Sequence, residues 1–450
     1  MNTLIDQLAR ILPARIEGRI LQTTGLTVAV ADFPVPLGAQ VEIDSYLGGR
    51  LSAEVIGFTE DATLLYPLNT MTGVRRGDRV RLRYSAGWLA VGQQLLGRIV
   101  DVNGYPIDGG PPLARVDRIP RNRNAPAAVS RPTIEKPFST GIRAIDGLLT
   151  CGQGQRMGIF SGAGAGKSTM TGMLARQSDA DVNVIALIGE RGREVNEFVQ
   201  RELGTEGLAK SVIVVATSDQ PAPMRLRAAS TATAIAEYFR DQQKNVLLLM
   251  DSITRIAMAQ REIGIAAGEP PTTRGCPPSV FALLPKLIER AGRSKEGNIT
   301  AFYNVLVEGN DPQEPISDAL RGLLDGQIWL SQDLAARGHY PAIDILQSVS
   351  RLSLTLMSED QQAAAKKFRT LLANYREHAE LISLGAYRQG TNPDVDEALR
   401  FHETMDQYLC QSNRISCSFR SARDELLSIL PQDSTSSRRP CEGDGPMELQ

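Results

Sequence analysis

A glycine-rich segment, MGIFSGAGAGKST at residues 157–169, has the residue types and spacing of a phosphate-binding loop. Its apolar beginning predicts a buried strand, and the successive glycines let backbone N–H groups surround an anion at a helix N-terminus. Lys167 is expected to reach the β- and γ-phosphates of ATP, and Ser168 to bind Mg²⁺. The predicted nucleotide cradle consists of Ser161, Gly162, Ala163, Gly164, Ala165, Gly166, Lys167, Ser168 and Thr169.

The loop departs from the strict phosphate-loop pattern at one position. The pattern G-x4-G-K-[ST] has glycine where this chain has Ser161. The glycines that follow alternate with alanine, and we expect them to keep the loop flexible enough to bind Mg-ATP.

A second segment, NVLLLMD at residues 245–251, is an apolar strand that ends in a carboxylate. In a parallel sheet Asp251 would lie at the same edge as the phosphate loop, where a Mg²⁺-coordinating aspartate belongs. Helix N-capping is the alternative role for an aspartate in this position.

A third apolar strand, at residues 182–190, ends in Glu190. A carboxylate at that edge of the sheet can orient and polarise the water that attacks a phosphate ester. Pairing of Glu190 with Arg191 or Arg193 in a structural ion pair is the alternative.

Two later residues carry weaker signals. Tyr340 could stack its ring on adenine, although a tyrosine before a proline is often only part of a turn. Arg351, in DILQSVSRL, could act as an arginine finger, but nothing in its local sequence requires this.

The elements that position these residues follow a clear order along the chain. Short strand-like stretches separated by turns fill residues 15–84 and predict a small β-barrel or sandwich. A Pro- and Gly-rich stretch follows, either as a linker or wrapped around the next domain. Apolar strands then alternate with helical patterns over residues 134–354, which predicts a parallel sheet covered on both faces. Two amphipathic helices after residue 358 complete the expected α/β protein.

The composition is that of an ordinary globular protein, with 42% hydrophobic and 22% charged residues and a net charge of −2. Because there is no basic surplus, we expect no nucleic acid partner. The five cysteines and three histidines are scattered without ligand-like spacing, so a reducing cytosol is favoured and no metal cage is expected.

No segment is apolar enough for a bilayer span, and the N-terminus lacks the pattern of a signal peptide. Residues 4–12 place apolar side chains on one helical face. That face either packs on its own domain or docks on a partner or a membrane surface.

Taken together, the chain resembles the catalytic subunit of rotary-type ATPases, and most closely the export ATPase of bacterial type III secretion systems. The resemblance runs from the N-terminal strands to the C-terminal helices. The strings that carry it include TGIRAIDGLLTCGQGQRMGIF, ALIGERGREVNEF, VVATSDQPAPMRLRA, LLLMDSITRIAMAQREIGIAAGEPPTTRG, LVEGNDPQEPISDALRGLLDGQIWLS and ARGHYPAID.

The resemblance implies roles at matching positions. Lys167 and Ser168 would contact phosphate and Mg²⁺, Glu190 would activate water, and Asp251 would complete the metal side. Arg191 would lie beside Glu190, Tyr340 would stack on adenine, and Arg351 would reach the nucleotide of a neighbouring subunit.

The implied architecture is a β-barrel, a RecA-like core with a parallel sheet, and a helical C-terminal domain, assembled as a homohexamer. The expected boundaries are a docking segment at 1–14, a barrel at 15–86, the ATPase domain at 87–354, helices at 355–431 and a disordered tail at 432–450. The implied partners are a coiled-coil stalk protein, a peripheral stator that regulates the ring, chaperone–substrate complexes and the export apparatus. The ring would lie at the cytoplasmic face of the inner membrane.

Within the family, Thr150-Cys151-Gly152 favours the injectisome branch over the flagellar one. Cys276, where an aromatic residue is usual, and Asn310, where aspartate is usual, affect stretches that would face the channel or stalk. A non-catalytic ring subunit is disfavoured because Glu190 is present. An RNA translocase is disfavoured because residues 15–84 carry few of the exposed aromatic and basic residues that it would need.

Overall fold

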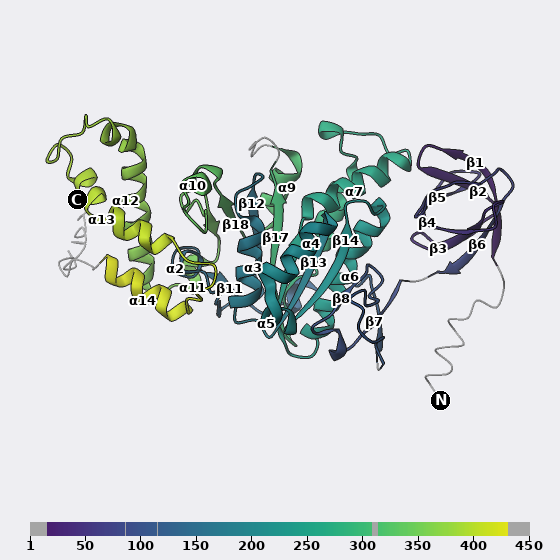
Figure 1. The fold of residues 1–450 in the computed structure, drawn as a ribbon, viewed down its shortest axis with the longest axis horizontal. Helices are drawn as coiled ribbons and strands as arrows, with labels where there is room; N and C mark the ends of the chain where they lie inside the picture. The colour runs from purple at the N-terminus through teal and green to yellow at the C-terminus, as the bar shows by residue number, and fades with distance from the viewer. Residues whose placement is uncertain (1–15, 86, 115, 308–313, 431–450) are drawn as a thin grey trace, which may run out of the picture.

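The molecule is elongated, and three parts follow one another along its long axis: a barrel, an α/β body and a group of helices (Figure 1). The computed structural model describes residues 16–85, 87–114, 116–307 and 314–430. The expectations for residues 1–14, Asn310 and residues 432–450 lie outside this description. Within it, no helix combines the length and the apolar character needed to cross a bilayer.

Six antiparallel strands close the barrel in the order β1-β2-β5-β4-β3-β6. Side chains alternate between core and surface, as Val41 and Ile43 show by lying fully buried on either side of Glu42. The strands are β1 (Glu17–Thr24), β2 (Thr27–Ala31), β3 (Gln40–Asp44), β4 (Arg50–Phe58), β5 (Thr63–Pro67) and β6 (Arg79–Tyr84).

The Pro- and Gly-rich segment after the barrel wraps the α/β body and does not act as a free linker. The guanidinium of Arg131 donates hydrogen bonds to the carbonyls of Glu289 and Ala291, and Arg123 forms an ion pair with Asp241. The short elements of this segment are β7 (Trp88–Val91), η1 (Gln93–Leu95), β8 (Ile99–Val100), β9 (Asp117–Pro120), η2 (Ala128–Ser130) and β10 (Pro137–Phe138).

The body is built on a nine-stranded sheet with the order β19-β18-β12-β17-β15-β13-β14-β8, and β16 pairs beside β17. All its pairings are parallel except those of β16 and β19, which confirms the expected parallel sheet. The strands not yet placed are β12 (Arg156–Ser161), β13 (Val182–Glu190), β14 (Ser211–Thr217), β15 (Asn245–Asp251), β16 (Gly292–Arg293), β17 (Asn298–Leu306), β18 (Gly326–Leu330) and β19 (Val349–Ser350).

Helices cover both faces of this sheet. Alternate residues of β13 enter opposite cores: Val184 and Ala186 join one, and Ile185 and Leu187 join the other. This double burial explains why the strands are apolar at nearly every position.

The helices on the first face are α6 (Ala222–Arg240), α7 (Ile253–Ala266), α8 (Pro278–Ile288) and α9 (Pro315–Leu323). Those on the second face are α2 (Arg143–Leu148), α3 (Lys167–Gln177), the π-helical turn η3 (Phe198–Leu203) and α5 (Gly204–Ala209). The remaining short elements of the body are β11 (Cys151–Gly152), α4 (Gly192–Glu197), η4 (Thr273–Gly275), α10 (Gln332–Ala336) and α11 (Ser353–Leu356).

The C-terminal part consists of α12 (Glu359–Ser383), α13 (Pro393–Leu409) and α14 (Phe419–Ile429). Each begins at a side-chain cap, with Ser358, Asn392 and Ser418 accepting backbone N–H bonds. The sequence predicted the first two helices but missed α14, although the Ser418 cap and the apolar spacing that follows it were readable signals.

One arginine connects the C-terminal helices to the body. Arg143, on α2, donates to the carbonyls of Gln407, Tyr408 and Cys410 at the end of α13. One nitrogen of the same guanidinium donates to both carboxylate oxygens of Glu425 on α14. Since the last carbonyls of a helix have no partner within the helix, Arg143 both caps α13 and holds it against α2.

We expect Arg143→Lys to loosen this junction, because an ammonium keeps the charge but loses the planar fork. Losing two charge-assisted hydrogen bonds should speed amide hydrogen exchange in α13 and α14 by at least about tenfold. Exchange measured by mass spectrometry should leave β13 and β15 unchanged.

Arg423→Lys is the matched control, because among the described residues Arg423 pairs only with its neighbour Asp424 on the surface of α14. Equal effects of the two substitutions would show that Arg143 has no special role in the docking of these helices.

Candidate active site

The phosphate loop leaves the carboxyl end of β12 and enters α3. Gly164 and Gly166 have φ values of 80° and 84°, a region that L side chains rarely adopt. Gly166 is the residue before α3, and Lys167 is the first residue of that helix. The hydroxyl of Ser161 is buried and has no hydrogen-bond partner among the described residues. The loop therefore has the backbone that closely spaced N–H groups around an anion require.

Three of the predicted residues meet at the carboxyl edge of the sheet. The Lys167 ammonium contacts the Asp251 carboxylate, and its Nζ lies 3.4 Å from Glu190 Oε1. All three side chains are largely buried, with 14%, 5% and 18% of their surfaces exposed. Because β12, β13 and β15 run parallel, the strand ends that carry them share one edge.

Asp251 is not the cap of the helix that follows it. Ser252 precedes α7, and its hydroxyl accepts the backbone N–H of Arg255 at 3.4 Å. The capping alternative for Asp251 is therefore wrong, and its carboxylate is directed at Lys167.

Glu190 is set by a local distortion of β13. Gly189 has a φ of 74°, and the strand pairing with β14 shifts between Ile188 and Glu190. A Cβ on Gly189 would lie 2.9 Å from Cγ of Arg255. This bulge turns the Glu190 side chain towards Lys167.

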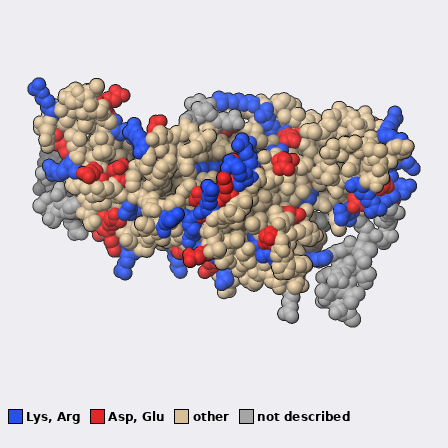
Figure 2. Space-filling model, in the orientation of Figure 1, with Lys and Arg blue, Asp and Glu red and all other residues tan. Residues whose placement is uncertain are grey.

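The alternative of a structural ion pair between Glu190 and its neighbours is wrong. Arg191 lies 3.8 Å from Glu194, and Arg193 pairs with Glu197 at 2.7 Å. Over α4, basic and acidic side chains lie next to one another near the centre of the face shown in Figure 2. The Arg191 side chain is 77% exposed on that surface, so this chain does not bring it into the buried cluster.

The charges in the cluster alter one another. Burial acts to lower the pKa of Lys167, but the carboxylates of Asp251 and Glu190 outweigh it and leave that pKa raised. Burial raises the pKa of Glu190 to about 7; Lys167 opposes this rise, while Asp251 and a hydrogen bond with Glu194 add to it. Lys167 therefore stays charged near neutral pH, whereas Glu190 can gain or lose a proton there.

Glu194 is a site residue that the sequence did not reveal. Its carboxylate shares a hydrogen bond with Glu190, and that bond lowers the pKa of Glu194. The only readable signal was the four-residue spacing within ERGRE, which gains meaning once the strand-to-helix turn is known.

Tyr340 lies beside the phosphate loop. A Cβ on Gly166 would be 3.4 Å from Cε1 of its ring, which places the ring against the loop backbone. The residue is 45% exposed, so one side of the ring is open to a planar group. Gln332, also missed from sequence, donates to the carbonyl of Ala163 at 2.6 Å and holds the other side of the loop.

Arg351 lies at the opposite edge of the sheet. Its backbone N–H donates to the carbonyl of Asp325, and its side chain donates to the carbonyl of Arg321. Asp325 in turn binds Arg156, the first residue of β12. From there to the phosphate loop the strand rises roughly 16 Å, at about 3.3 Å per residue, so Arg351 does not reach the loop of its own chain.

The residues at the carboxyl edge suit Mg-ATP. Backbone N–H groups and the Lys167 ammonium match the charge of a phosphate chain. The exposed Ser168 hydroxyl and the Asp251 carboxylate are the hard oxygen donors that Mg²⁺ prefers.

Comparison with known proteins supports a nucleotide-binding protein. Residues 141–350 match the ATP synthase alpha/beta family, nucleotide-binding domain, and residues 357–428 match the T3SS EscN ATPase C-terminal domain. The flagellum-specific ATP synthase of Bacillus subtilis is 47% identical, over 88% of this chain and 90% of its own length. The type 3 secretion system ATPase of Xanthomonas euvesicatoria is also 47% identical, over 95% of this chain and 97% of its own.

Solved structures also match most of the chain. The assembled ATPase EscN from the type III secretion system of enteropathogenic E. coli has a TM-score of 0.87 and 42% identity, covering 92% of this chain and 99% of EscN. EscN in complex with its central stalk EscO has a TM-score of 0.84 and 41% identity, with the same coverage. These likenesses confirm the expected fold class and family: the chain belongs to the ATP synthase alpha/beta family, as an ATP-hydrolysing member of the branch that contains the type III secretion and flagellum-specific enzymes.

Proposed function

We propose that this protein hydrolyses Mg-ATP as the subunit of a homohexameric ring that powers protein export through a bacterial type III secretion system. In this assignment Lys167 binds the phosphate chain, and Ser168 and Asp251 hold Mg²⁺. The bound ion neutralises charge on the phosphates. Glu190 orients the attacking water and accepts its proton, and Tyr340 stacks on adenine.

The position of Arg351 is the observation that best supports assembly into a ring. Each chain has a phosphate loop at the carboxyl edge of its sheet and Arg351 at the amino edge. If Arg351 is the finger residue, it must therefore reach the phosphate chain of another copy. The assembled state of EscN supports this arrangement for a relative with the same fold. Exposed Arg191 would act in the same assembled site.

The partners follow from the same family. The complex of EscN with its central stalk EscO supports a coiled-coil stalk protein in the ring. A peripheral stator, chaperone–substrate complexes and the export apparatus at the cytoplasmic face of the inner membrane complete the proposal, with chaperone release as one use of the energy. Relatives of both branches match at 47% identity, so the injectisome assignment rests on Thr150-Cys151-Gly152.

Mixing two inactive variants tests the finger directly. Glu190→Gln should lower ATP turnover by about 10²–10⁴, and Arg351→Ala by about 10³–10⁵. In rings mixed at equal amounts, a site is complete when an Arg351→Ala chain holds the nucleotide and a Glu190→Gln chain donates the finger. Independent sites should then regain about a quarter of wild-type turnover, since each condition holds for about half of the chains.

Each variant alone, carried through the same dissociation and reassembly, is the control. No recovery in the mixture, with rings verified by light scattering, would contradict donation between copies. Wild-type turnover per chain should also rise steeply with protein concentration where the ring assembles.

The pKa of Glu190 predicts the pH dependence of turnover. The group must be deprotonated to accept a proton, so kcat/KM for ATP should fall as the pH drops below about 7. Glu194→Gln removes the carboxylate that favours the protonated form, so the acidic limb should move to lower pH.

Glu197→Gln, an exposed change on the same helix, should leave that limb in place. A profile that is the same in wild type and Glu194→Gln would assign the acidic limb to another group.

The proposed stacking role of Tyr340 predicts that its removal weakens ATP binding and leaves the hydrolysis step unchanged. Tyr340→Ala should raise the KM for ATP by about tenfold, because base–aromatic stacking contributes roughly 1–3 kcal/mol, while kcat stays within about twofold. Tyr340→Phe keeps the ring and should behave as wild type. A loss confined to kcat in Tyr340→Ala would refute the stacking role.

A further inference from the structure

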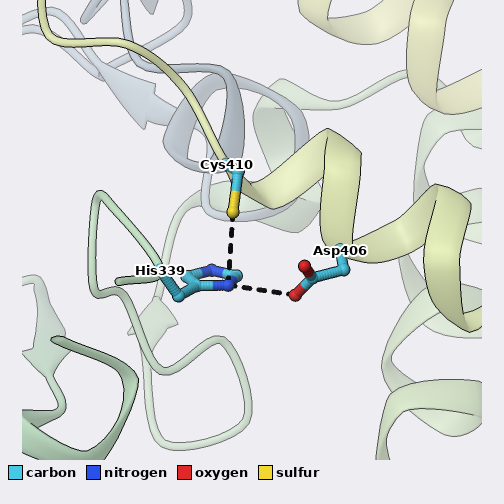
Figure 3. Close-up of side chains that lie close together, drawn as sticks. All are labelled: His339, Asp406 and Cys410. Atoms are coloured by element: carbon cyan, nitrogen blue, oxygen red, sulfur yellow. Dashed lines mark hydrogen bonds and ion pairs between the residues drawn. The ribbon is translucent and has the colours of Figure 1, made fainter. Parts of the chain in front are cut away.

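Three side chains outside the nucleotide site meet where the body joins the C-terminal helices. His339 lies in the loop after α10, Asp406 lies on the last turn of α13, and Cys410 follows that helix (Figure 3). His339 Nδ1 is 3.0 Å from Asp406 Oδ1 and 3.4 Å from Cys410 Sγ. All three donor atoms lie within 4.8 Å of one another, the one such group of histidine, cysteine and acidic side chains in the described part of the chain.

Both neighbours are directed at the same ring nitrogen. A neutral imidazole carries at most one hydrogen on Nδ1, so it can donate to Asp406 or to Cys410 but not fully to both. The other ring nitrogen, Nε2, is buried without a partner among the described residues. A cation between the three donor atoms would engage all of them at once.

The donor types select the class of cation. Thiolate sulfur, imidazole nitrogen and carboxylate oxygen bind Zn²⁺ at about 2.3, 2.0 and 2.0 Å, and tetrahedral geometry then separates the donors by roughly 3.3–3.6 Å. The two separations from His339 Nδ1, 3.0 and 3.4 Å, are close to that arrangement. The carboxylate of Asp406 and the sulfur of Cys410 lie within 4.8 Å of each other, and side-chain rotation would close the remaining gap. Mg²⁺ does not fit, since it prefers oxygen ligands.

The charges of the three side chains and the access of solvent to them also fit a divalent cation. A thiolate and a carboxylate balance a divalent ion, and the imidazole ligates as the neutral form. The His339 side chain is 8% exposed, whereas Asp406 is 53% exposed and gives solvent a path to the site. Water can therefore enter as a fourth ligand.

We propose that His339, Asp406 and Cys410 form a binding site for a thiophilic divalent cation of the Zn²⁺ class. The ion fastens the loop that carries Tyr340 to the end of α13. That loop already has one link there, since the backbone N–H of Gln411 donates to the carbonyl of Tyr340 at 2.8 Å. The site thus adds a second, metal-dependent link next to the proposed adenine contact.

Co²⁺ is the probe, titrated into the purified, reduced, nucleotide-free full chain. A thiolate ligand gives Co²⁺ an intense charge-transfer absorption band, and tetrahedral geometry gives strong visible bands. Both should appear with one equivalent of Co²⁺ and disappear when Zn²⁺ displaces it. Cys410→Ser should abolish the charge-transfer band, and Asp406→Asn should weaken Co²⁺ binding by at least about tenfold, since loss of even an outer partner of a metal ligand has effects of that size.

Cys417→Ser is the matched control, because Cys417 is another partly buried cysteine on the same connection. Asp251→Asn is a second control: it removes the carboxylate proposed to hold Mg²⁺ at the nucleotide site, so both Co²⁺ bands should persist in it. Circular dichroism verifies that each variant is folded. If Cys410→Ser does not fold, Asp406→Asn tests the site in its place, because Asp406 is largely exposed. The proposal is overturned if wild type shows no charge-transfer band, if Cys410→Ser retains it, if Cys417→Ser loses it, or if Asp406→Asn binds Co²⁺ as tightly as wild type.

Discussion

The nucleotide site depends on one buried cation held between two carboxylates. Lys167 arrives on the phosphate loop after β12, while Asp251 and Glu190 arrive at the ends of β15 and β13. An unpaired charge at this depth would be costly, so the three groups must be delivered together. Parallel strands meet that requirement, because equivalent ends of every strand lie at one edge. The two-faced hydrophobic burial of the sheet is thus what fixes the charges in register.

The same strand polarity makes the two edges of the sheet chemically different. The carboxyl edge carries the anion-binding loop and its carboxylates, and the amino edge carries Arg156, Asp325 and Arg351. No rotation of an arginine side chain spans the length of β12. A reaction that needs groups from both edges must therefore join two copies of the chain. If Arg351 is the finger residue, as proposed, the topology of the sheet makes the site depend on assembly.

Much of the α/β body could be predicted because its signals are local. Apolar runs that end in Glu190 or Asp251, or that lead into the loop before Lys167, report both burial and the functional edge. The rest depended on pairs that are distant in sequence. The cluster of His339 and Asp406 joins residues 67 positions apart, and Arg143 meets Glu425 across 282 positions. No spacing rule reveals such contacts, since helix packing alone brings them together. Helix α14 is a different case, because its N-terminal cap and the apolar spacing that follows are local signals from which the helix could have been predicted.

The Tyr340 loop connects the candidate nucleotide site to the C-terminal helices through direct contacts. The loop lies against the phosphate loop on one side and is held by Gln411 and Asp406 on the other. Arg143 in turn fixes the end of α13, from which those contacts come. In the proposed function, a partner that shifted α13 would also move the Tyr340 ring beside the phosphate loop. If that movement changed the affinity for nucleotide by some factor, linkage requires that nucleotide change the affinity for the partner by the same factor.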